Sequence, residues 1–488
     1  MSPIALTFAL SALTTAAITA ADLAGTWSGM AILDGDSTAI ALEIEPAEEG
    51  RSLLKGTIPA IHLKSQAFGK VRAEVRGDSV TLGPFAFVHD PATQSLSGLI
   101  PEALLPVYKV PLTLRRATSL PPQTRAGDGA PPLVPAPAPA WTFDAKAPLW
   151  GGATFSRGFL FAGDDSGRVH ALDAKTGREF WSFRTGGAIR GRPLVQSRGL
   201  YVASDDGRLY QFDMKTGARG WTVQVESTAV VRHPIGDPRS IWDRYGSDPV
   251  LMVGGLLYLG THDGRVLALD PVTGTKRWEF ATRGPVLAAV RFEGKTVYAG
   301  SYDGRVYALD ATTGAMRWSF DTRGPVVSTP AFAGDRIVVG SRSYDLYALA
   351  AADGHPLWKR YSWFSWVESS PTVVNGIAYV GSSDASAVHA YDVKDGRLLW
   401  KSDVHGWAWG QPAVSDTRVY IGTVGSAATD GRQVGAIAVL DRSTGRLVAR
   451  LPAPPKEDGQ FGYAGSPALG GGLAYFTGLD GKILAIPQ

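Results

Sequence analysis

The sequence predicts an all-β protein: an eight-bladed β-propeller closed by its N- and C-terminal strands, preceded by a small antiparallel β-barrel or sandwich. Its 488 residues include 58 glycines and 32 prolines, and 19% are charged, which is typical of turn-rich β structure. From Trp141 onward, a unit of short alternating strands repeats, most clearly at 264–280 and 304–320. A Trp recurs at one position of this unit. Such a repeat, with four short strands per copy, is typical of a propeller blade.

Residues 1–21 form an apolar stretch that ends in small residues, which predicts a signal peptide cleaved after Ala20 or Ala21. No Lys or Arg precedes the stretch, so the signal would be atypical. Thr and Ser interrupt the stretch and it is short for a spanning helix, so we expect no transmembrane helix in the mature chain. The predicted location is periplasmic or secreted.

The composition excludes several classes of site and partner. The chain has no Cys, which excludes disulfides, thiolate metal sites, a Cys nucleophile and a lipid-modified N-terminal Cys. The net charge is +3 without a long run of Lys or Arg, so we expect no nucleic-acid partner. The spacing of the His residues predicts no zinc site. We expect a monomer.

Residues 22–116 contain seven alternating segments at meander spacing, which predicts a small antiparallel barrel or sandwich. The segments are TWSGMAILD, STAIALEIE, RSLLKGTI, GKVRAEVR, SVTLGPFAFV, SLSGLI and YKVPLTLRR. The opening Gly25-Thr26-Trp27 loosely resembles the start of lipocalin-like barrels, and the alternative is a Trp that only fills a small core. Residues 117–140 are rich in Pro and Ala, which predicts a linker to the propeller at 141–488.

Eight units are counted from one aligned position that is usually Asp. The aligned residues are Asp173, Asp213, Asp270, Asp310, Ala350, Asp392, Asp441 and Pro487. The last unit stops before its Trp, whereas Trp141 begins a Trp-bearing strand that has no blade strands before it. We therefore predict that the Trp141 strand completes the eighth blade, which closes the ring and leaves no sheet edge exposed.

Each part of the unit has a structural explanation. Asp303-Gly304 suits a tight hairpin, and Gly314 suits the positive φ of the turn after Asp310. The recurring Trp is best explained as docking one blade onto its neighbour, where truncation to Ala would cost about 3–5 kcal/mol. The blade-docking residues are Trp141, Trp181, Trp221, Trp278, Trp318, Trp358 and Trp400, and Ala449 replaces the Trp once.

The ALDxxTGxxxW core of these units is similar to the PQQ-type (pyrroloquinoline-quinone-type) propeller repeat, and the similarity covers residues 141–488. The resemblance implies the propeller fold and leaves the function open. The family includes calcium- and quinone-dependent alcohol and glucose dehydrogenases, and also non-enzymatic propellers such as a lipoprotein of the bacterial outer-membrane protein assembly machine. The site must therefore decide between them, and we favour the non-enzymatic branch.

A binding site is predicted at one mouth of the central channel, where the loops into the innermost strands converge. The predicted ring at this mouth is Trp150, Arg190, Gly246, Leu287, Val327, Glu368, Trp409 and Ala464. Aromatic anchors on loops favour a binding surface, and the alternative is that these rings cap the channel and pack on one another. The candidate ligand-binding residues are Trp150, Arg190, Trp242, Asp243, Tyr245, Trp363, Trp366, Glu368, Trp407, Trp409, Phe461 and Tyr463.

Two further features lie near this mouth. The third unit carries an insertion at about 226–247 that contains His233 and several charges, a pattern found more often in solvated loops than in catalytic sets. Glu368 is flanked by Trp366 and Ser369. If Glu368 is buried among aromatic rings, its pKa should rise, and it could act as a general acid, a calcium ligand or a cation-binding group.

The favoured function is a binding or scaffold protein that holds a cell-envelope protein, or a small or saccharide ligand, at the propeller mouth, with no cofactor and no catalytic residue. The alternative is a dehydrogenase dependent on PQQ and calcium. The resemblance implies that such an enzyme would hold calcium with acidic residues and an Asn, and many members place a disulfide against the cofactor. Here Cys is absent, Asn375 belongs to a hairpin turn, and Arg190 is the one basic residue of the ring.

Overall fold

The computed structural model describes residues 19, 21–33, 36–48, 51–59, 63–101, 109–121, 134–135, 137–231, 249–253, 255–426, 433–457 and 459–488. The chain divides into two compact units, Met1–Arg125 and Ala126–Gln488, and each is described by itself. Among the described residues, no helix combines the length and the apolar character that crossing a bilayer requires.

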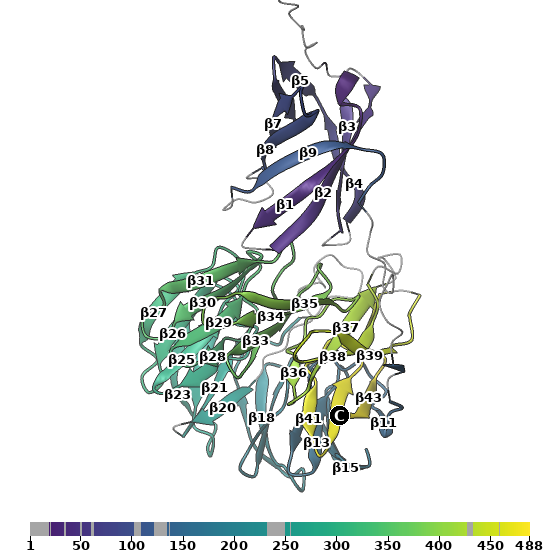
Figure 1. Ribbon diagram of the computed structural model, residues 1–488. Helices are drawn as coiled ribbons and strands as arrows, with labels where there is room; N and C mark the ends of the chain where they lie inside the picture. Colours follow the sequence, from purple (N-terminus) through teal and green to yellow (C-terminus); the bar gives the residue numbers. More distant parts are fainter. Residues whose placement is uncertain are drawn as a thin grey trace, which may run out of the picture. The chain divides into compact units, whose positions relative to one another are not determined.

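The first unit is a nearly closed antiparallel barrel of nine strands, preceded by the short 3₁₀ helix η1 (Ala21–Leu23) (Figure 1). The strands pair in the order β4-β3-β2-β1-β9-β8-β7-β6-β5. Their bounds are β1 (Gly25–Leu33), β2 (Asp36–Pro46), β3 (Ser52–Ile58), β4 (Leu63–Val71), β5 (Ala73–Arg76), β6 (Ser79–Leu82), β7 (Phe85–Asp90), β8 (Ser95–Leu99) and β9 (Pro111–Ala117).

The prediction of a small antiparallel barrel is confirmed, but the predicted number of seven strands is wrong. Two predicted segments each contain two strands. One is divided at Arg72, between β4 and β5, and the other at Gly83-Pro84, between β6 and β7. Gly83 has φ 57° and Pro84 lacks a backbone N–H, so the second division is a turn that the continuous apolar pattern concealed.

Trp27 anchors the interior of the barrel. Its side chain is fully buried, and its Nε1–H donates to the carbonyl of Leu23 in η1 at 2.8 Å. The guanidinium of Arg116, on β9, lies 4.8 Å from the centre of the indole ring, in cation–π contact. Trp27 therefore fills the core and also connects β1 to η1 and to the last strand of the barrel.

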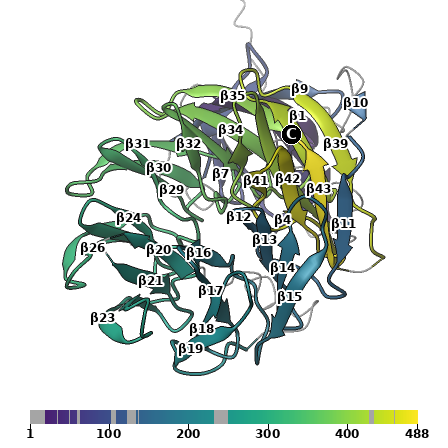
Figure 2. The ribbon, with the colours of Figure 1, turned by 90° about the horizontal axis from the view of Figure 1, so that it is seen from below.

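The second unit is a ring of eight antiparallel blades around a central axis, which confirms the predicted fold (Figure 2). Blades 1 to 4 consist of β12 (Thr154–Ser156), β13 (Phe159–Gly163), β14 (Arg168–Asp173) and β15 (Glu179–Arg184); β16 (Leu194–Gln196), β17 (Gly199–Ser204), β18 (Arg208–Asp213) and β19 (Arg219–Gln224); β20 (Pro249–Val253), β21 (Leu256–Gly260), β22 (Arg265–Leu269) and β23 (Lys276–Ala281); and β24 (Arg291–Glu293), β25 (Thr296–Gly300), β26 (Arg305–Asp310) and β27 (Met316–Asp321).

The remaining blades complete the ring. Blades 5 to 8 consist of β28 (Ala331–Ala333), β29 (Arg336–Gly340), β30 (Asp345–Ala350) and β31 (Pro356–Tyr361); β32 (Thr372–Val374), β33 (Ile377–Gly381), β34 (Ala387–Asp392) and β35 (Leu398–Asp403); β36 (Ala413–Val414), β37 (Arg418–Ser426), β38 (Ala436–Asp441) and β39 (Leu447–Pro452), with β40 (Gln460–Gly462) paired to β37; and β41 (Ala468–Gly470), β42 (Leu473–Thr477), β43 (Lys482–Pro487) and the N-terminal β11 (Trp141–Asp144).

The closure of the ring follows the sequence prediction. β11 is the outer strand of blade 8 and pairs antiparallel with β43, with Trp141 opposite Ala485 and Asp144 opposite Lys482. Blade 7 carries an addition that the sequence did not suggest. β10 (Val134–Pro135), which lies in the segment predicted to be only a linker, pairs in parallel with the outer strand β39 at Ala449 and Arg450.

The seven repeated Trp residues connect adjacent blades. Each indole Nε1–H donates to a backbone carbonyl in the turn of the next blade at 2.8–3.2 Å; the acceptors are Ala174, Met214, Pro271, Ala311, Ala351, Val393 and Arg442. The indole also lies on the glycine of that turn. A Cβ added to Gly314, which has φ 74°, would lie 2.6 Å from the Trp278 ring, so neither a side chain nor another backbone conformation fits there.

The hydrophobic core lies mainly between blades. One cluster joins Val338, Leu346 and Trp358 of blade 5 to Ala378 and Tyr391 of blade 6, and similar clusters fill the other seams. Since each blade buries its faces against two neighbours, its stability depends on the completeness of the ring.

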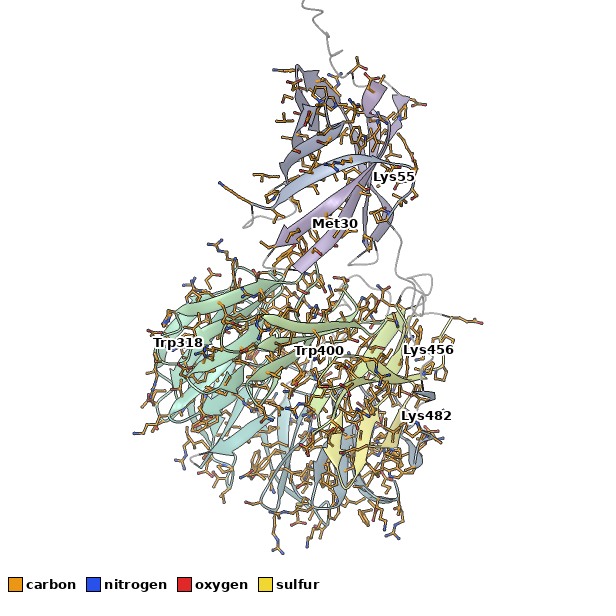
Figure 3. All side chains as sticks on the ribbon, viewed as in Figure 1. Met30, Lys55, Trp318, Trp400, Lys456 and Lys482 are labelled. Carbon is orange, nitrogen blue, oxygen red and sulfur yellow. The ribbon has the colours of Figure 1, made fainter. Side chains whose placement is uncertain are left out.

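Replacing Trp318 tests the seam between blades 4 and 5 (Figure 3). We expect Trp318→Ala to lower the free energy of unfolding by about 3–5 kcal/mol, because it removes a buried ring and its hydrogen bond to Ala351. Trp318→Phe should cost less, since a ring remains. Met316→Ala, at a position 53% exposed on the same strand, is the control and should change stability by less than about 0.5 kcal/mol. Urea unfolding measures all three, and equal effects would contradict the docking role.

His389, on β34 in blade 6, should make the stability of the protein depend on pH. Burial, and secondarily Lys401 opposite it, hold the pKa of His389 well below its usual value, so the imidazole is neutral in the folded chain. Its ring stacks on Tyr391 at 5.8 Å. The unfolded chain takes up a proton on His389 as pH falls through about 6.5, whereas the folded chain does not. His389 therefore lowers the free energy of unfolding as the pH is lowered.

We expect His389→Leu to reduce the loss of unfolding free energy between about pH 7.5 and about pH 5.5 by about 1 kcal/mol. Leu is the matched choice because Leu267 holds the same register in blade 3. Urea titrations of both proteins at the two pH values measure the difference. Parallel losses in the two proteins would show that His389 already carries its proton when folded.

Candidate functional site

The predicted mouth ring lines one opening of the central channel. Its described members come from seven blades and surround a cavity of about 110 Å³; they are Trp150, Arg190, Leu287, Val327, Glu368, Trp409 and Ala464. Gly246, the eighth predicted member, lies outside the described residues. Beyond the ring, the channel widens to a cavity of about 590 Å³ lined by the innermost strands and the residues just before them.

The opening is narrow because neighbouring innermost segments approach closely at glycines. A Cβ added to Gly151 would lie 2.7 Å from the carbonyl oxygen of Arg190, and one added to Gly410 would lie 2.9 Å from that of Gly465. The loops therefore bring backbone against backbone where the channel opens.

Arg190 is fixed on one side of the mouth by an ion pair from the preceding blade. Its Nε and Nη2 atoms donate to the two carboxylate oxygens of Asp165 at 2.8 Å each. Its guanidinium also lies 5.2 Å from the centre of the Trp150 ring. A bidentate pair with a stacked ring holds an Arg in one orientation, so this side of the mouth is rigid.

Glu368 is fixed on another side by Arg342. Both side chains are almost fully buried, and Arg342 Nε donates to Glu368 Oε1 at 2.6 Å. Arg342 Nη1 donates to the hydroxyl of Tyr302 at 2.9 Å, and the guanidinium lies 4.9 Å from the centre of the Trp366 ring. Glu368 is therefore buried beside an aromatic ring, as the sequence suggested, but it faces a guanidinium that the sequence analysis did not anticipate.

Trp409 completes the aromatic part of the ring. It stacks on Trp407 at 5.1 Å, with 12° between the ring planes, and its Nε1–H donates to Ser383 Oγ at 3.2 Å. The Nε1–H of Trp407 is buried and has no acceptor among the residues that the structure describes. Trp150, Trp366 and Trp409 are each partly exposed, and Trp150 and Trp409 line the opening.

A second ring of residues supports the first, and the sequence analysis missed it. Asp165, Arg342 and Ser383 hold equivalent positions, two residues after the Gly that ends the second strand of each blade. Each contacts the mouth-ring residue of the next blade: Arg190, Glu368 and Trp409 respectively. Aligning this variable position across the repeats would have revealed these partners.

Three predicted ligand-binding aromatics are buried. Trp363 is 1% exposed and packs edge-on against Tyr361 at 5.7 Å. Phe461 and Tyr463 belong to the core cluster between blades 7 and 8, and Tyr463 lies edge-on to Phe476. Burial raises the pKa of Tyr361 and of Tyr463, so both phenols stay protonated. These side chains lie behind the mouth and pack in the core. Packing of this kind is the alternative that the sequence analysis gave to ligand binding.

The loop that holds Trp363 is strained. Trp363 and the following Phe364 have φ values of 28° and 61°, a region that bulky side chains rarely occupy. Positive φ recurs at the Trp363 position of the repeat, at Lys146, Arg323 and His405, whereas the positive φ of Phe364 has no counterpart at Gly324. Such strain is maintained only by surrounding packing and is concentrated at functional sites.

The remaining predicted residues cannot be placed at the mouth. Trp242, Asp243 and Tyr245 lie outside the described residues, together with Arg232, His233, Asp237 and Arg244 of the same insertion. Their predicted roles stay predictions.

Residues 136–286, 262–365 and 346–487 match the protein family described as outer membrane protein assembly factor BamB. The matches cover more than half of the chain. The chain belongs to this PQQ-like β-propeller repeat family. The fold agrees, since BamB from Moraxella catarrhalis superposes with a TM-score of 0.55 at 19% identity, over 72% of this chain and all of that one.

Several proteins that are similar to parts of this chain are named as enzymes. The quinoprotein alcohol dehydrogenase PedH of Pseudomonas putida is 42% identical over 56 residues, which are 11% of this chain and 9% of that protein. The tetrathionate hydrolase of Acidithiobacillus ferrooxidans is 36% identical over 124 residues, 24% of this chain and 21% of that protein. The chain thus spans a small part of these relatives, and their activities are not transferred by the match.

The described residues of the mouth do not supply a calcium site. Calcium takes six to eight oxygen ligands, and among these residues the carboxylates of Asp165 and Glu368 are paired with Arg190 and Arg342. Within the described ranges, no three His, Asp or Glu side chains come together as a metal site. The opening is about 110 Å³, whereas the cavity beyond it, at about 590 Å³, is within the range of typical ligand pockets of about 300–1,000 Å³.

Breaking the pair of Arg342 and Glu368 tests whether it is structural. We expect Arg342→Met to lower the free energy of unfolding by about 3–5 kcal/mol, because it leaves a buried carboxylate without its guanidinium. Replacing both residues with Met should recover most of this loss, since an apolar pair needs no mutual compensation. Urea unfolding of the single and double variants measures the recovery, and a double variant as unstable as the single one would contradict this role.

Proposed function

We propose that this protein is an exported propeller of the cell envelope that binds another protein at the channel mouth, acting as a binding or scaffold module. The observation that carries the proposal is the pair of partly exposed rings of Trp150 and Trp409 at a narrow opening, with Trp366 packed on Arg342 beside Glu368. Rigid aromatic anchors lose little entropy on binding and dominate the energetics of protein recognition. The apolar leader predicted at residues 1–21 supports export.

The size of the mouth favours a protein segment over a saccharide chain or a cofactor. A cavity of about 110 Å³ accommodates roughly one inserted side chain, and the Trp rings around it would cover the flanking residues. Arg190 and Glu368 are already paired, so they would set the polarity of the rim rather than neutralise a charged ligand. Membership in the BamB-like family is compatible with a non-catalytic role.

The test places a photo-crosslinking amino acid, p-benzoylphenylalanine, at Val327 of the mouth ring in the full-length protein in its own cells. We expect a discrete crosslinked product with one envelope protein. Trp366→Ala with Trp409→Ala should reduce its yield by more than about 10-fold, because two aromatic anchors are lost. The thermal midpoint should fall by only a few degrees.

The same crosslinker at Met316, on the outer strand β27, is the control. Equal products from Val327 and Met316 would contradict binding at the mouth. Dye-linked alcohol oxidation by the purified protein after addition of PQQ and Ca²⁺ would replace the proposal with the dehydrogenase alternative.

A further inference from the structure

A basic surface occupies blades 1 and 2 at the end of the ring opposite the mouth. Two turns of each blade meet at this end, as the backbone hydrogen bonds from Ala174 to Gly158 and from Met214 to Arg198 show. Six exposed cations lie on these turns and at the adjacent strand ends. They form the surface that we call the basic patch: Arg157, Lys175, Arg178, Arg198, Lys215 and Arg219.

The patch is continuous across the seam between the two blades, which are neighbours in the ring (Figure 2). Arg157 of blade 1 donates to the carbonyl of Ser197 in blade 2 at 2.9 Å. The docking Trp181 of blade 1 donates to Met214 of blade 2, next to Lys215. The six charges therefore lie on one rigid platform.

The cations of the patch outnumber its carboxylates, which are Asp173, Glu179 and Asp213; Arg178 interacts electrostatically with Asp173, and Arg198 with Asp213. In the described part of the chain, none of the six lies within 4.0 Å of a carboxylate oxygen in an ion pair. The carboxylates of Asp173 and Asp213 accept backbone N–H groups of their own turns, and Glu179 contacts His170.

Corresponding turns elsewhere in the ring differ. In blades 3 and 4, Arg277 and Arg317 pair with the turn carboxylates of Asp270 and Asp310 at 2.6 and 2.7 Å. Blade 6 pairs Arg397 with Asp392 at 3.6 Å. The Arg side chains of these turns are thus paired, whereas among the described residues those of blades 1 and 2 form no ion pair within 4.0 Å; Lys295 in blade 4 and Lys394 in blade 6 are exposed as well.

Exposed apolar side chains accompany the cations. Phe180 is 42% exposed, and the guanidinium of Arg178 lies 5.4 Å from its ring centre. Val272 is 81% exposed on the corresponding turn of blade 3, beside the Pro271 carbonyl to which Trp221 of blade 2 donates. Basic residues together with exposed apolar side chains are typical of surfaces that lie on anionic bilayers, where cations meet headgroups and apolar groups enter the acyl boundary.

We propose that the basic patch binds the surface of a membrane rich in anionic phospholipid, with Phe180 entering the interface. Each Lys or Arg near such a surface contributes about 1 kcal/mol, so six act together strongly at low salt. The proposal is separate from binding at the mouth, which uses the other end of the ring.

The test measures co-sedimentation of the full-length protein with vesicles of phosphatidylglycerol and phosphatidylcholine, and with vesicles of phosphatidylcholine alone. We expect binding to the anionic vesicles, weakened by salt. Arg178→Gln with Arg198→Gln and Lys215→Gln should lower the partition coefficient by about 100-fold. The matched control, Arg277→Gln with Arg317→Gln and Arg397→Gln, removes the same charge and should lower it by less than about 3-fold.

Phe180→Ala should weaken binding to anionic vesicles even at high salt, because it removes an apolar contact and leaves the charge unchanged. Equal losses in the two triple variants would overturn the proposal, since binding would then depend on overall charge. Binding of heparin without binding of anionic vesicles would also overturn it and would indicate a soluble polyanion as the partner. The thermal midpoints of all variants verify that each one folds.

Discussion

The contact on which the ring depends is that of an indole with the turn of the next blade. Each docking Trp buries its ring on a glycine that has positive φ and donates its N–H to the carbonyl beside the turn. The same interaction therefore supplies apolar burial, a satisfied donor and a fixed distance between blades. Because the turn glycine has no side chain, each Trp fits only at this spacing, and repetition of the contact around the circle determines the curvature of the ring.

That rigidity reaches the mouth through side chains that cross between blades. Asp165, Arg342 and Ser383 each extend from one blade to the mouth-ring residue of the next, so the ring is oriented by its neighbours and not by its own loops. The charges of the mouth are consequently satisfied within the protein. Trp150 and Trp409 contribute the aromatic part of the opening, beside small and polar residues such as Thr329, Ser370 and Gln411.

The sequence predicted most of the fold, because the repeat reports the same physical requirement many times. Asp, turn glycine and Trp recur at fixed offsets. The Trp141 strand has no blade of its own, and the last blade lacks its outer strand, so the two were predicted to pair. The sequence did not predict β10, because a strand of two residues that pairs with the outer strand of a blade has no periodic pattern. In the barrel, two turns were hidden within apolar runs.

The candidate site was predictable in position but not in chemistry. The ring residues could be located from repeat alignment, and seven of them line the opening. The partner of the Glu368 carboxylate is Arg342, which is 26 residues away in the chain and belongs to another blade. Likewise, Trp363 and Trp366 are three residues apart, yet one is buried and the other half-exposed, because a local φ reversal turns the loop between them.

The pairing of β11 with β43 has a consequence for the order of events during synthesis. Trp141 and its strand leave the ribosome long before the final residues that will hold them, so the growing chain carries an unsatisfied strand edge until translation is almost complete. Completion of the internal blades does not close the circle, because β11 pairs with β43. A truncation of even the last strand would therefore leave both ends of the circle open, however complete the rest of the polypeptide.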